Sequence, residues 1–189
     1  MEALFSSPRE IAAQCVGFLA MAVALFIYTF RSRKKILLSK LAADLLWIVH
    51  YALLGAFSGA GINLVNAFRE GVFYHRDRKW ASSRLWLLLF VLLNILLTAL
   101  TWQGAISLLP MLGSSVNTLA LFCKKTRHIR LLSVPALSAW LIYSVLTRSI
   151  ASTAVNAITI LSALYALWRD RTPKTAPPSA GLEKGETEL

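Results

Sequence analysis

The sequence predicts an all-α transmembrane protein with seven helices. Of its 189 residues, 57% are hydrophobic and only 15% are charged, and the mean hydropathy is +0.60. A soluble domain normally has more polar surface than this composition provides. The formal net charge is +11, but the basic residues form short clusters between long apolar segments. Such clusters orient membrane helices, whereas a nucleic-acid-binding protein needs a basic face, so no nucleic-acid partner is predicted.

Each predicted helix is an apolar segment of about the length that crosses a bilayer. A basic cluster follows the first segment, whereas a secretory signal peptide carries its positive charge in front. Small residues separate the second segment from the third, and Gly104 marks the turn before the fifth. The seven predicted segments are 11–30, 36–54, 57–74, 85–102, 105–122, 131–146 and 150–168. The polar tail, residues 171–189, contains Pro and Gly and is expected to be disordered.

The distribution of Lys and Arg predicts the orientation in the membrane. Nearly all of them follow the first, third, fifth and seventh segments, and only Arg9 and Arg148 lie at the opposite ends. Loops rich in Lys and Arg stay on the cytoplasmic side. The sequence therefore predicts a multi-pass protein with its N-terminus outside and its C-terminus in the cytoplasm.

An internal repeat organises the chain. An offset of 93 residues aligns 11–70 with 104–163 without a gap, and it places Trp47 on Trp140 and Asn63 on Asn156. The first unit, 11–74, and the second, 104–168, each hold three helices, so they run in the same direction only if one more helix stands between them. The segment 75–103 is therefore predicted to hold a basic cytoplasmic loop and an inversion linker helix, which gives a 3+1+3 arrangement.

This arrangement resembles a known group of transporters. Parallel three-helix bundles, each with a Trp sixteen residues before an Asn, are similar to the SWEET, SemiSWEET and wider PQ-loop (MtN3-like) superfamily. The stretches HYALLGAFSGAGINLVNAFR and LLPMLGSSVNTLALF more closely resemble the YgjV-type bacterial inner-membrane proteins. The resemblance covers about residues 11–168. It implies alternating access by rocking of the two bundles in a bacterial inner membrane, with Trp47, Asn63, Trp140 and Asn156 lining a central pocket.

The hinges of the superfamily are only partly present. Its Pro followed by Gln on the first helix of each bundle appears here as Pro110 and Met111, and the aligned position in the first unit is Gly17. Pro135, on the sixth helix, has no proline counterpart. The resemblance thus implies hinges at Gly17, Pro110 and Pro135. Either glycine supplies the flexibility of the first unit, or only the second unit bends.

The spacing of Trp and Asn supports a common site independently of the family. Trp47 and Asn63 each lie eight residues from Gly55, which is about 12 Å of helix. That depth is near the middle of a hydrocarbon core of ~30 Å. An indole face offers apolar contact and a carboxamide offers donors and an acceptor, which suits a small neutral polyol.

A purely structural interpretation of the same residue types stays open. An Asn in a membrane helix can serve only to bond a neighbouring helix, an interpretation that also fits Asn66, Asn94 and Asn117. Tryptophans often form belts at the membrane interface, which suits Trp80, Trp102 and Trp168.

Two ionisable residues could couple transport to protons. Asp44 lies within the second segment on the face of Trp47, where a charge is costly; it could be a coupling site, an anchor for a substrate ammonium group, or an ion pair with Lys40. His50 could shuttle protons or bond within the bundle. The charges of Arg69 and Glu70 are expected at the membrane interface.

No motif predicts catalysis, a cofactor or a metal. HExxH, GxSxG and phosphate-loop patterns are absent, and Cys15 and Cys123 show no ligand or redox spacing, so both are interpreted as small apolar residues. The predicted function is facilitated transport of a small neutral polar solute, with sugars as the leading class. The alternatives are a receptor or assembly factor without transport activity and a proton-coupled amino-acid-type transporter that uses Asp44. The predicted partners are the bilayer and the solute, and a homo-oligomer stays open.

Overall fold

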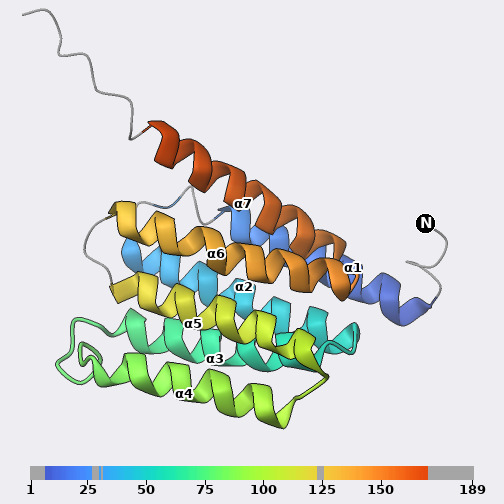
Figure 1. Ribbon diagram of the computed structural model, residues 1–189, viewed down its shortest axis with the longest axis horizontal. Coiled ribbons are helices and arrows are strands. Elements are labelled where there is room, and N and C mark those ends of the chain that lie inside the picture. The colour runs from blue at the N-terminus through green and yellow to red at the C-terminus, as the bar shows by residue number, and fades with distance from the viewer. Residues whose placement is uncertain (1–6, 27–29, 31, 123–125, 170–189) are drawn as a thin grey trace, which may run out of the picture.

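The computed structural model describes residues 7–26, 30, 32–122 and 126–169, which form seven α-helices and one short 3₁₀ turn but no strand (Figure 1). The elements are α1 (Pro8–Phe26), α2 (Arg33–Leu53), α3 (Phe57–Tyr74), α4 (Leu85–Leu100), η3 (Ala105–Ser107), α5 (Leu108–Phe122), α6 (Thr126–Leu146) and α7 (Ile150–Arg169). All seven predicted helices are therefore confirmed within these residues. The predicted tail and Cys123 lie outside the described part of the chain.

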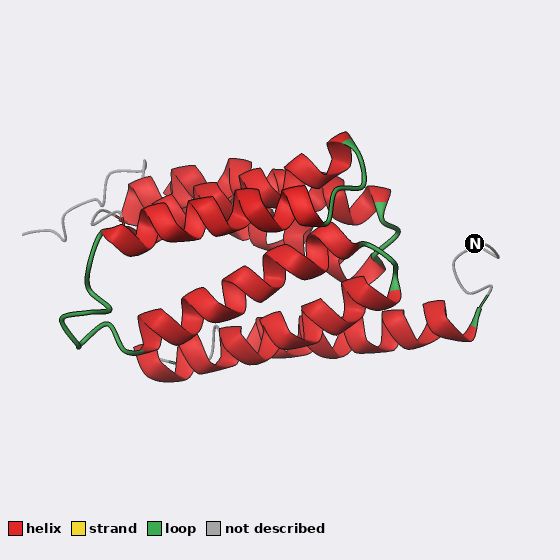
Figure 2. Ribbon diagram, turned by 90° about the horizontal axis from the view of Figure 1, so that it is seen from below, coloured by secondary structure: helices red, strands yellow, loops and turns green. Residues whose placement is uncertain are grey.

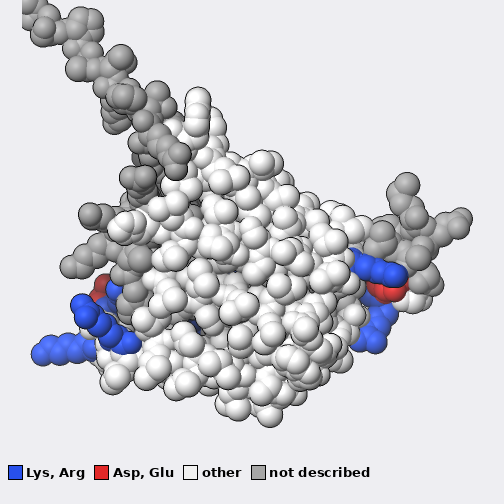
Figure 3. Space-filling model, viewed as in Figure 1, with Lys and Arg blue, Asp and Glu red and all other residues white. Residues whose placement is uncertain are grey.

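Three of the described helices have the dimensions of membrane spans. Within the described residues, Pro8–Phe26, Lys34–Leu53 and Ile150–Trp168 are long and apolar enough to cross a membrane by length and composition. The helical segments Leu85–Leu100, Ala105–Ala120 and Leu131–Leu146 are apolar but shorter. Figure 3 shows the described Lys, Arg, Asp and Glu side chains gathered at the two ends of this face, with an uncharged band between them. Such a band fits the hydrocarbon core of a bilayer.

Six of the helices pack in a closed ring. α1 packs on α2 and α7, α3 packs on α2 and α5, and α6 packs on α5 and α7. α4 lies outside this ring against α3 and α5 (Figure 1). The end that carries the loop at residues 75–84 is called here the basic-loop end, and the end with the α2–α3 and α6–α7 turns is called the hairpin end (Figure 2).

The α2–α3 and α6–α7 hairpins are built alike. The tip residue has a positive φ in both, 73° at Gly55 and 57° at Arg148, and these positions are 93 residues apart. Just after each tip, the backbone N–H of Ala56 (2.9 Å) or Ser149 (2.8 Å) bonds the carbonyl five residues earlier. Left-handed backbone costs a non-glycine residue about 1–2 kcal/mol, so its occurrence at Arg148 shows that the surrounding structure imposes the turn. The repeat seen in sequence thus extends to backbone geometry.

The two hairpins also clasp each other. On α6, the Tyr143 hydroxyl accepts a 2.8 Å hydrogen bond from the N–H of Gly59 and donates one of 3.3 Å to the carbonyl of Ala56. On α2, His50 Nε2 lies 2.6 Å from Ser149 Oγ. His50 and Tyr143 are 93 residues apart, as are Ala56 and Ser149. α6 of the second unit is therefore hydrogen-bonded to the start of α3, and α2 of the first unit to the start of α7. These reciprocal contacts pack the two units together at the hairpin end.

Polar contacts join α3 to the α5 side of the ring along its length. Ser58 bonds Ser107 of the preceding η3 turn at 2.7 Å. Further along, the Ser114 hydroxyl donates to Asn66 Oδ1 at 2.5 Å, and Arg69 Nη1 donates to Thr118 Oγ1 at 2.7 Å. Hydrogen bonds between membrane helices contribute about 0.6 to 1.7 kcal/mol each. These hydrogen bonds consequently hold the first and second halves of the chain together along the α3–α5 side of the ring.

Candidate functional site: a cavity inside the helix ring

A cavity of about 180 Å³ opens inside the ring between α2, α3, α5, α6 and α7. Because a water molecule occupies about 30 Å³ of liquid, the space suits roughly six waters or a small solute. Its walls are mainly polar and aromatic. They consist of Lys40, Asp44, Trp47, Tyr51, Asn63, Asn66, Arg69, Asn117, Leu137, Trp140, Ser152, Val155 and Asn156.

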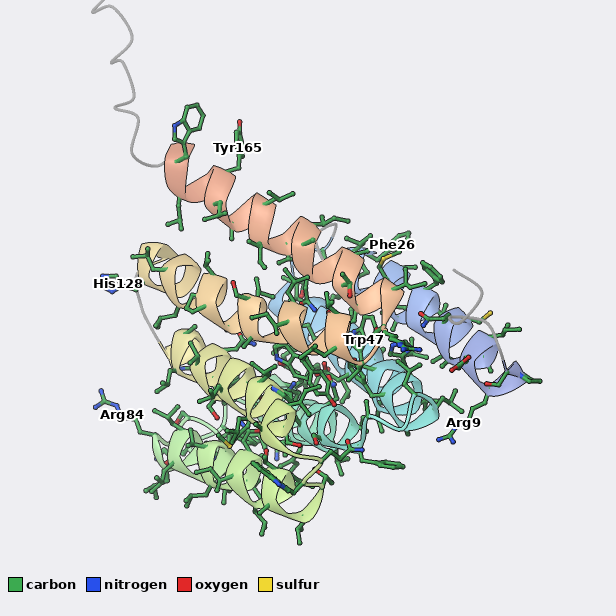
Figure 4. All side chains as sticks on the ribbon, turned by 45° about the vertical axis from the view of Figure 1, so that its right-hand side comes forward. Arg9, Phe26, Trp47, Arg84, His128 and Tyr165 are labelled. Atoms are coloured by element: carbon green, nitrogen blue, oxygen red, sulfur yellow. The ribbon has the colours of Figure 1, made fainter. Side chains whose placement is uncertain are left out.

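All four residues predicted as solute contacts line this one cavity. Trp47 comes from α2, Asn63 from α3, Trp140 from α6 and Asn156 from α7, so each unit contributes one Trp and one Asn. Figure 4 shows Trp47 among the side chains in the middle of the bundle. The fold thus brings the two repeat-related pairs together around one space.

Aromatic rings form the part of the wall nearest the hairpin end. The ring of Tyr51 lies between the two indoles, with centroids 6.1 Å from Trp47 and 6.0 Å from Trp140. Its hydroxyl bonds Ser152 Oγ at 2.7 Å, and Tyr143 packs behind it with a centroid distance of 5.6 Å. Tyr51 and Tyr143 are each only 1% exposed, so these rings separate the cavity from the hairpin end.

The two repeat-related asparagines present their oxygens. Asn63 Nδ2 donates to the Gly59 carbonyl at 2.8 Å, and Asn156 Nδ2 donates to Ser152 Oγ at 3.1 Å, in each case four residues back on the same helix. Among the described residues, no protein group bonds the Oδ1 atom of either Asn. Neither amide joins two helices directly, so both remain able to accept a hydrogen bond from a bound molecule.

The other three asparagines do not all have the helix-bonding role that the sequence suggested for them. Asn66 and Asn117 line the cavity as well, and Asn66 also bonds α5 through Ser114. Asn94, on α4, lies away from the cavity and donates to Ser114 at 3.3 Å and Ser115 at 3.2 Å. Four of the five asparagines of the chain thus line the same cavity. Asn94 is the one whose contacts are explained by helix packing alone.

The ion pair expected between Asp44 and Lys40 is not formed. Lys40 Nζ lies 3.1 Å from Glu70 Oε1 instead, and Arg69 Nη2 reaches the same oxygen at 3.1 Å. Asp44 lines the cavity, and its Oδ2 atom is buried with no hydrogen-bond partner among the described residues. The reason is geometric, because the carboxylate of Glu70 on the facing helix α3 lies within ion-pair distance of Lys40 and binds its ammonium group.

Arg69 and Glu70, expected near the membrane interface, have buried side chains that face the interior of the bundle. They are 2% and 1% exposed, and together with the half-buried Lys40 they form an ionic cluster at the cavity's basic-loop end. Because buried charges are costly unless paired, the carboxylate of Glu70 is what allows the Arg69 guanidinium to lie inside the protein. The sequence offers one signal for this: a charged pair in the interior of an otherwise apolar helix.

His50 lies beside the cavity wall rather than in it. It is completely buried, its Nδ1 lies 2.6 Å from the carbonyl oxygen of Ala13, and its ring is edge-on to Trp47 at 5.2 Å. The bundle-bonding interpretation of His50 is therefore the one that the contacts match. Gly17 has a packing role here, because a Cβ at this position would lie 2.6 Å from His50 Nδ1.

The two predicted hinge prolines occupy different positions in their helices. Pro110 is the third residue of α5, within the first turn, where its missing N–H breaks no helical hydrogen bond. Pro135 lies inside α6 and removes the bond to the Leu131 carbonyl. A groove of about 350 Å³ runs beside Pro135 between α6 and α7, and in Figure 1 α7 diverges from α6 toward this end. Bending at Gly17, Pro110 or Pro135 stays a prediction.

No metal centre is found within the described residues, where no group of three or more His, Cys, Asp or Glu side chains could hold an ion.

The fold and its cavity define a class: a polytopic helical membrane protein with a polar site inside an apolar bundle. The chain belongs to the YgjV family of bacterial inner membrane proteins, whose model matches residues 11–174.

A sequence relative supports the same assignment. The inner membrane protein YgjV of Escherichia coli (strain K12) is 24% identical to this chain over 149 residues, which is 79% of each protein. No solved structure matches the chain. The protein is therefore a bacterial inner membrane protein, and its activity has to be argued from the site.

Proposed function

We propose that this protein is a facilitative transporter of small neutral polar solutes, with sugars as the leading class, that works by alternating access. The observation that carries the proposal is the convergence of Trp47, Asn63, Trp140 and Asn156, two repeat-related pairs, on one cavity. Indole faces pack against the C–H surface of a polyol, and the free amide oxygens accept hydrogen bonds from its hydroxyls. A site shared by two halves is what a rocking transporter requires.

The helix packing supports the proposed 3+1+3 plan. α4 packs outside the ring against α3 and α5, as an inversion linker between α1–α3 and α5–α7 would. The equivalent hairpins and the mutual clasp relate the two units by the same offset of 93 residues. This organisation, together with the paired Trp and Asn, is the basis for the resemblance to SWEET and PQ-loop transporters. In the proposed orientation the hairpin end faces outward, so the structure corresponds to a state closed to the outside.

Transport by purified protein in liposomes tests the proposal. We expect protein-dependent uptake of at least one member of a panel of labelled sugars and other neutral solutes. Asn63→Ala and Asn156→Ala should each reduce that uptake about tenfold or more, because each loses a hydrogen-bond acceptor in the cavity. Asn94→Ala is the matched control, since this Asn is buried but lies outside the cavity. Uptake that persists in both cavity variants would exclude this site.

A proton-coupled mode is a second proposal, favoured by the unpartnered carboxylate of Asp44 in the cavity wall. It predicts that an imposed pH gradient drives accumulation and that Asp44→Asn abolishes this accumulation. Equal uptake with and without the gradient would leave only facilitated diffusion. A receptor or assembly factor, by contrast, would give no flux in either experiment.

A further inference from the structure

The cavity wall contains one carboxyl group that no described protein group contacts directly. Asp44 forms no ion pair or hydrogen bond with any described residue, and its Oδ2 atom is buried. Lys40, one helical turn away, has its Nζ atom at Glu70. An unpaired buried carboxylate is costly, and pairing with a bound cationic group removes that cost through strong charge-assisted hydrogen bonds.

The opposite charge is present on the same cavity wall. Lys40 and Arg69 line the cavity and share the single carboxylate of Glu70, so this cluster carries one net positive charge. Arg69 Nε and Glu70 Oε2 have no hydrogen-bond partner within the described structure. The cavity therefore offers a negative group, Asp44, and a separate net positive group.

Charge balance limits which solutes could bind to both Asp44 and the net positive cluster. Asp44, Glu70, Lys40 and Arg69 sum to zero. In a low-dielectric interior, a solute with a net charge would leave an uncompensated charge in the bundle. A zwitterion adds an ammonium and a carboxylate together and keeps the sum at zero.

The rest of the wall suits an ammonium group as well. The rings of Trp47, Tyr51 and Trp140 attract a cation held over their faces. The free Oδ1 atoms of Asn63 and Asn156 are acceptors, so they favour donors such as N–H and O–H over further acceptors.

We propose that the solute of this cavity is a small zwitterion, with its ammonium group bound by Asp44 and its carboxylate directed toward Lys40 and Arg69. This inference rests on the proposed transport function and, among neutral polar solutes, selects small zwitterions in place of sugars. A zwitterion of amino-acid size is neutral overall and is compatible with a cavity of about 180 Å³. Asp44 then acts in solute selection and is not a remnant of helix packing.

Four three-carbon probes separate the two charges experimentally. L-Serine carries both charged groups, serinol only the ammonium, glycerate only the carboxylate, and glycerol neither. Uptake of each labelled probe is measured in liposomes that contain the full chain. We expect L-serine to enter at least tenfold faster than glycerol, serinol or glycerate.

Substitution of Asp44 tests its role directly. Asp44→Asn should lower L-serine uptake about tenfold and remove the preference for L-serine over glycerate, whereas Asp44→Glu should restore part of that preference. Asp77→Asn is the control, because Asp77 forms an exposed ion pair of 3.7 Å with Lys34 outside the cavity. Thermal unfolding of each purified variant confirms that the comparison is made between folded proteins.

The outcomes distinguish this inference from the function on which it rests. Uptake of glycerol or sugars without a preference for L-serine would overturn the zwitterion inference and leave neutral transport intact. An unchanged ratio of L-serine to glycerate uptake in Asp44→Asn would overturn the role of Asp44. No uptake of any of the four probes would also overturn the inference, and the sugar panel would then decide the proposed function separately.

Discussion

At the scale of single residues, the site depends on how a few polar side chains are paired. Glu70 is the central residue of the ionic cluster, since one of its oxygens lies 3.1 Å from both Lys40 and Arg69. The pairing leaves Asp44 free to face the cavity. If Lys40 paired with Asp44 instead, the cavity wall would hold no carboxyl group without a direct partner.

Neutralising Glu70 should destabilise the protein strongly. Glu70→Gln leaves the buried Arg69 and the half-buried Lys40 without their shared partner, and breaking a buried ion pair costs about 3–5 kcal/mol. We expect a clear fall in the thermal unfolding temperature in detergent. Asp77→Asn breaks only the exposed pair with Lys34 and should change stability by less than about 1 kcal/mol. Equal stability of the two variants would contradict the assigned role of Glu70.

At the scale of helices, close approaches fix the wall of the cavity. Gly113 on α5 lies against α6, where an added Cβ would stand 2.7 Å from Trp140 Cδ1 and 2.8 Å from the carbonyl oxygen of Ala136. The backbone oxygen cannot move aside as a flexible side chain could. The position of Trp140 in the cavity therefore depends on the absence of a side chain at residue 113.

Gly113→Ala should separate α5 from α6 and displace Trp140. We expect a loss of about 1–3 kcal/mol of stability, which is typical of overpacking, together with a shift in tryptophan fluorescence. Gly71→Ala is the matched control, because a Cβ there meets nothing within 4 Å and alanine favours a helix. A Gly113→Ala variant as stable as the Gly71→Ala variant would show that the two helices are not this close.

At the scale of the whole molecule, the ring is joined unevenly. Polar contacts run along the α3–α5 side from Ser58 to Arg69. On the opposite side, Gln14 of α1 bonds the Arg148 carbonyl at 2.9 Å and the N–H of Ile150 at 3.3 Å, both at the hairpin end. The two units are therefore joined by polar contacts along the whole α3–α5 side, which lies next to α4. On the α1–α7 side, the hydrogen bonds of Gln14 join them at the hairpin end.

The proposed membrane orientation can be tested by cysteine labelling. In a parent with Cys15→Ser and Cys123→Ser, we introduce Arg148→Cys at the hairpin end and Ser82→Cys in the loop at the basic-loop end. A membrane-impermeant maleimide should label Arg148→Cys in intact cells and Ser82→Cys only after permeabilisation, because basic loops stay in the cytoplasm. The reverse pattern would mean that the orientation is inverted. The cysteine-free parent reports background labelling.

Much of the fold follows from the sequence because a bilayer limits the choices. Every backbone polar group in hydrocarbon must be bonded internally, so a long apolar segment becomes a helix. The third helix is found where predicted, at Phe57–Tyr74, whereas α6 begins at Thr126, five residues earlier than expected. Polar residues near a helix end give no hydropathy signal, which explains that difference.

The site was only partly predictable. Trp47, Asn63, Trp140 and Asn156 were found because the repeat marks them twice, and all four line the cavity. Asn66 and Asn117 were missed as cavity residues because neither has an Asn at its aligned position, so nothing in the repeat singled them out. A lone polar residue in a membrane helix gives the same sequence signal whether it faces a cavity or a neighbouring helix.

By itself, the sequence determined the helices, the offset of 93 residues and the Trp and Asn pairs, because hydropathy and repetition are properties of the chain order. Only the tertiary structure decided which charges meet. Lys40 lies four residues from Asp44, yet Glu70 on another helix takes its ammonium group. Ion pairing in a bundle depends on distances between helices, which residue spacing along one helix does not encode. That distinction is why Asp44, Lys40 and Arg69 acquire a role in the cavity only in the folded protein.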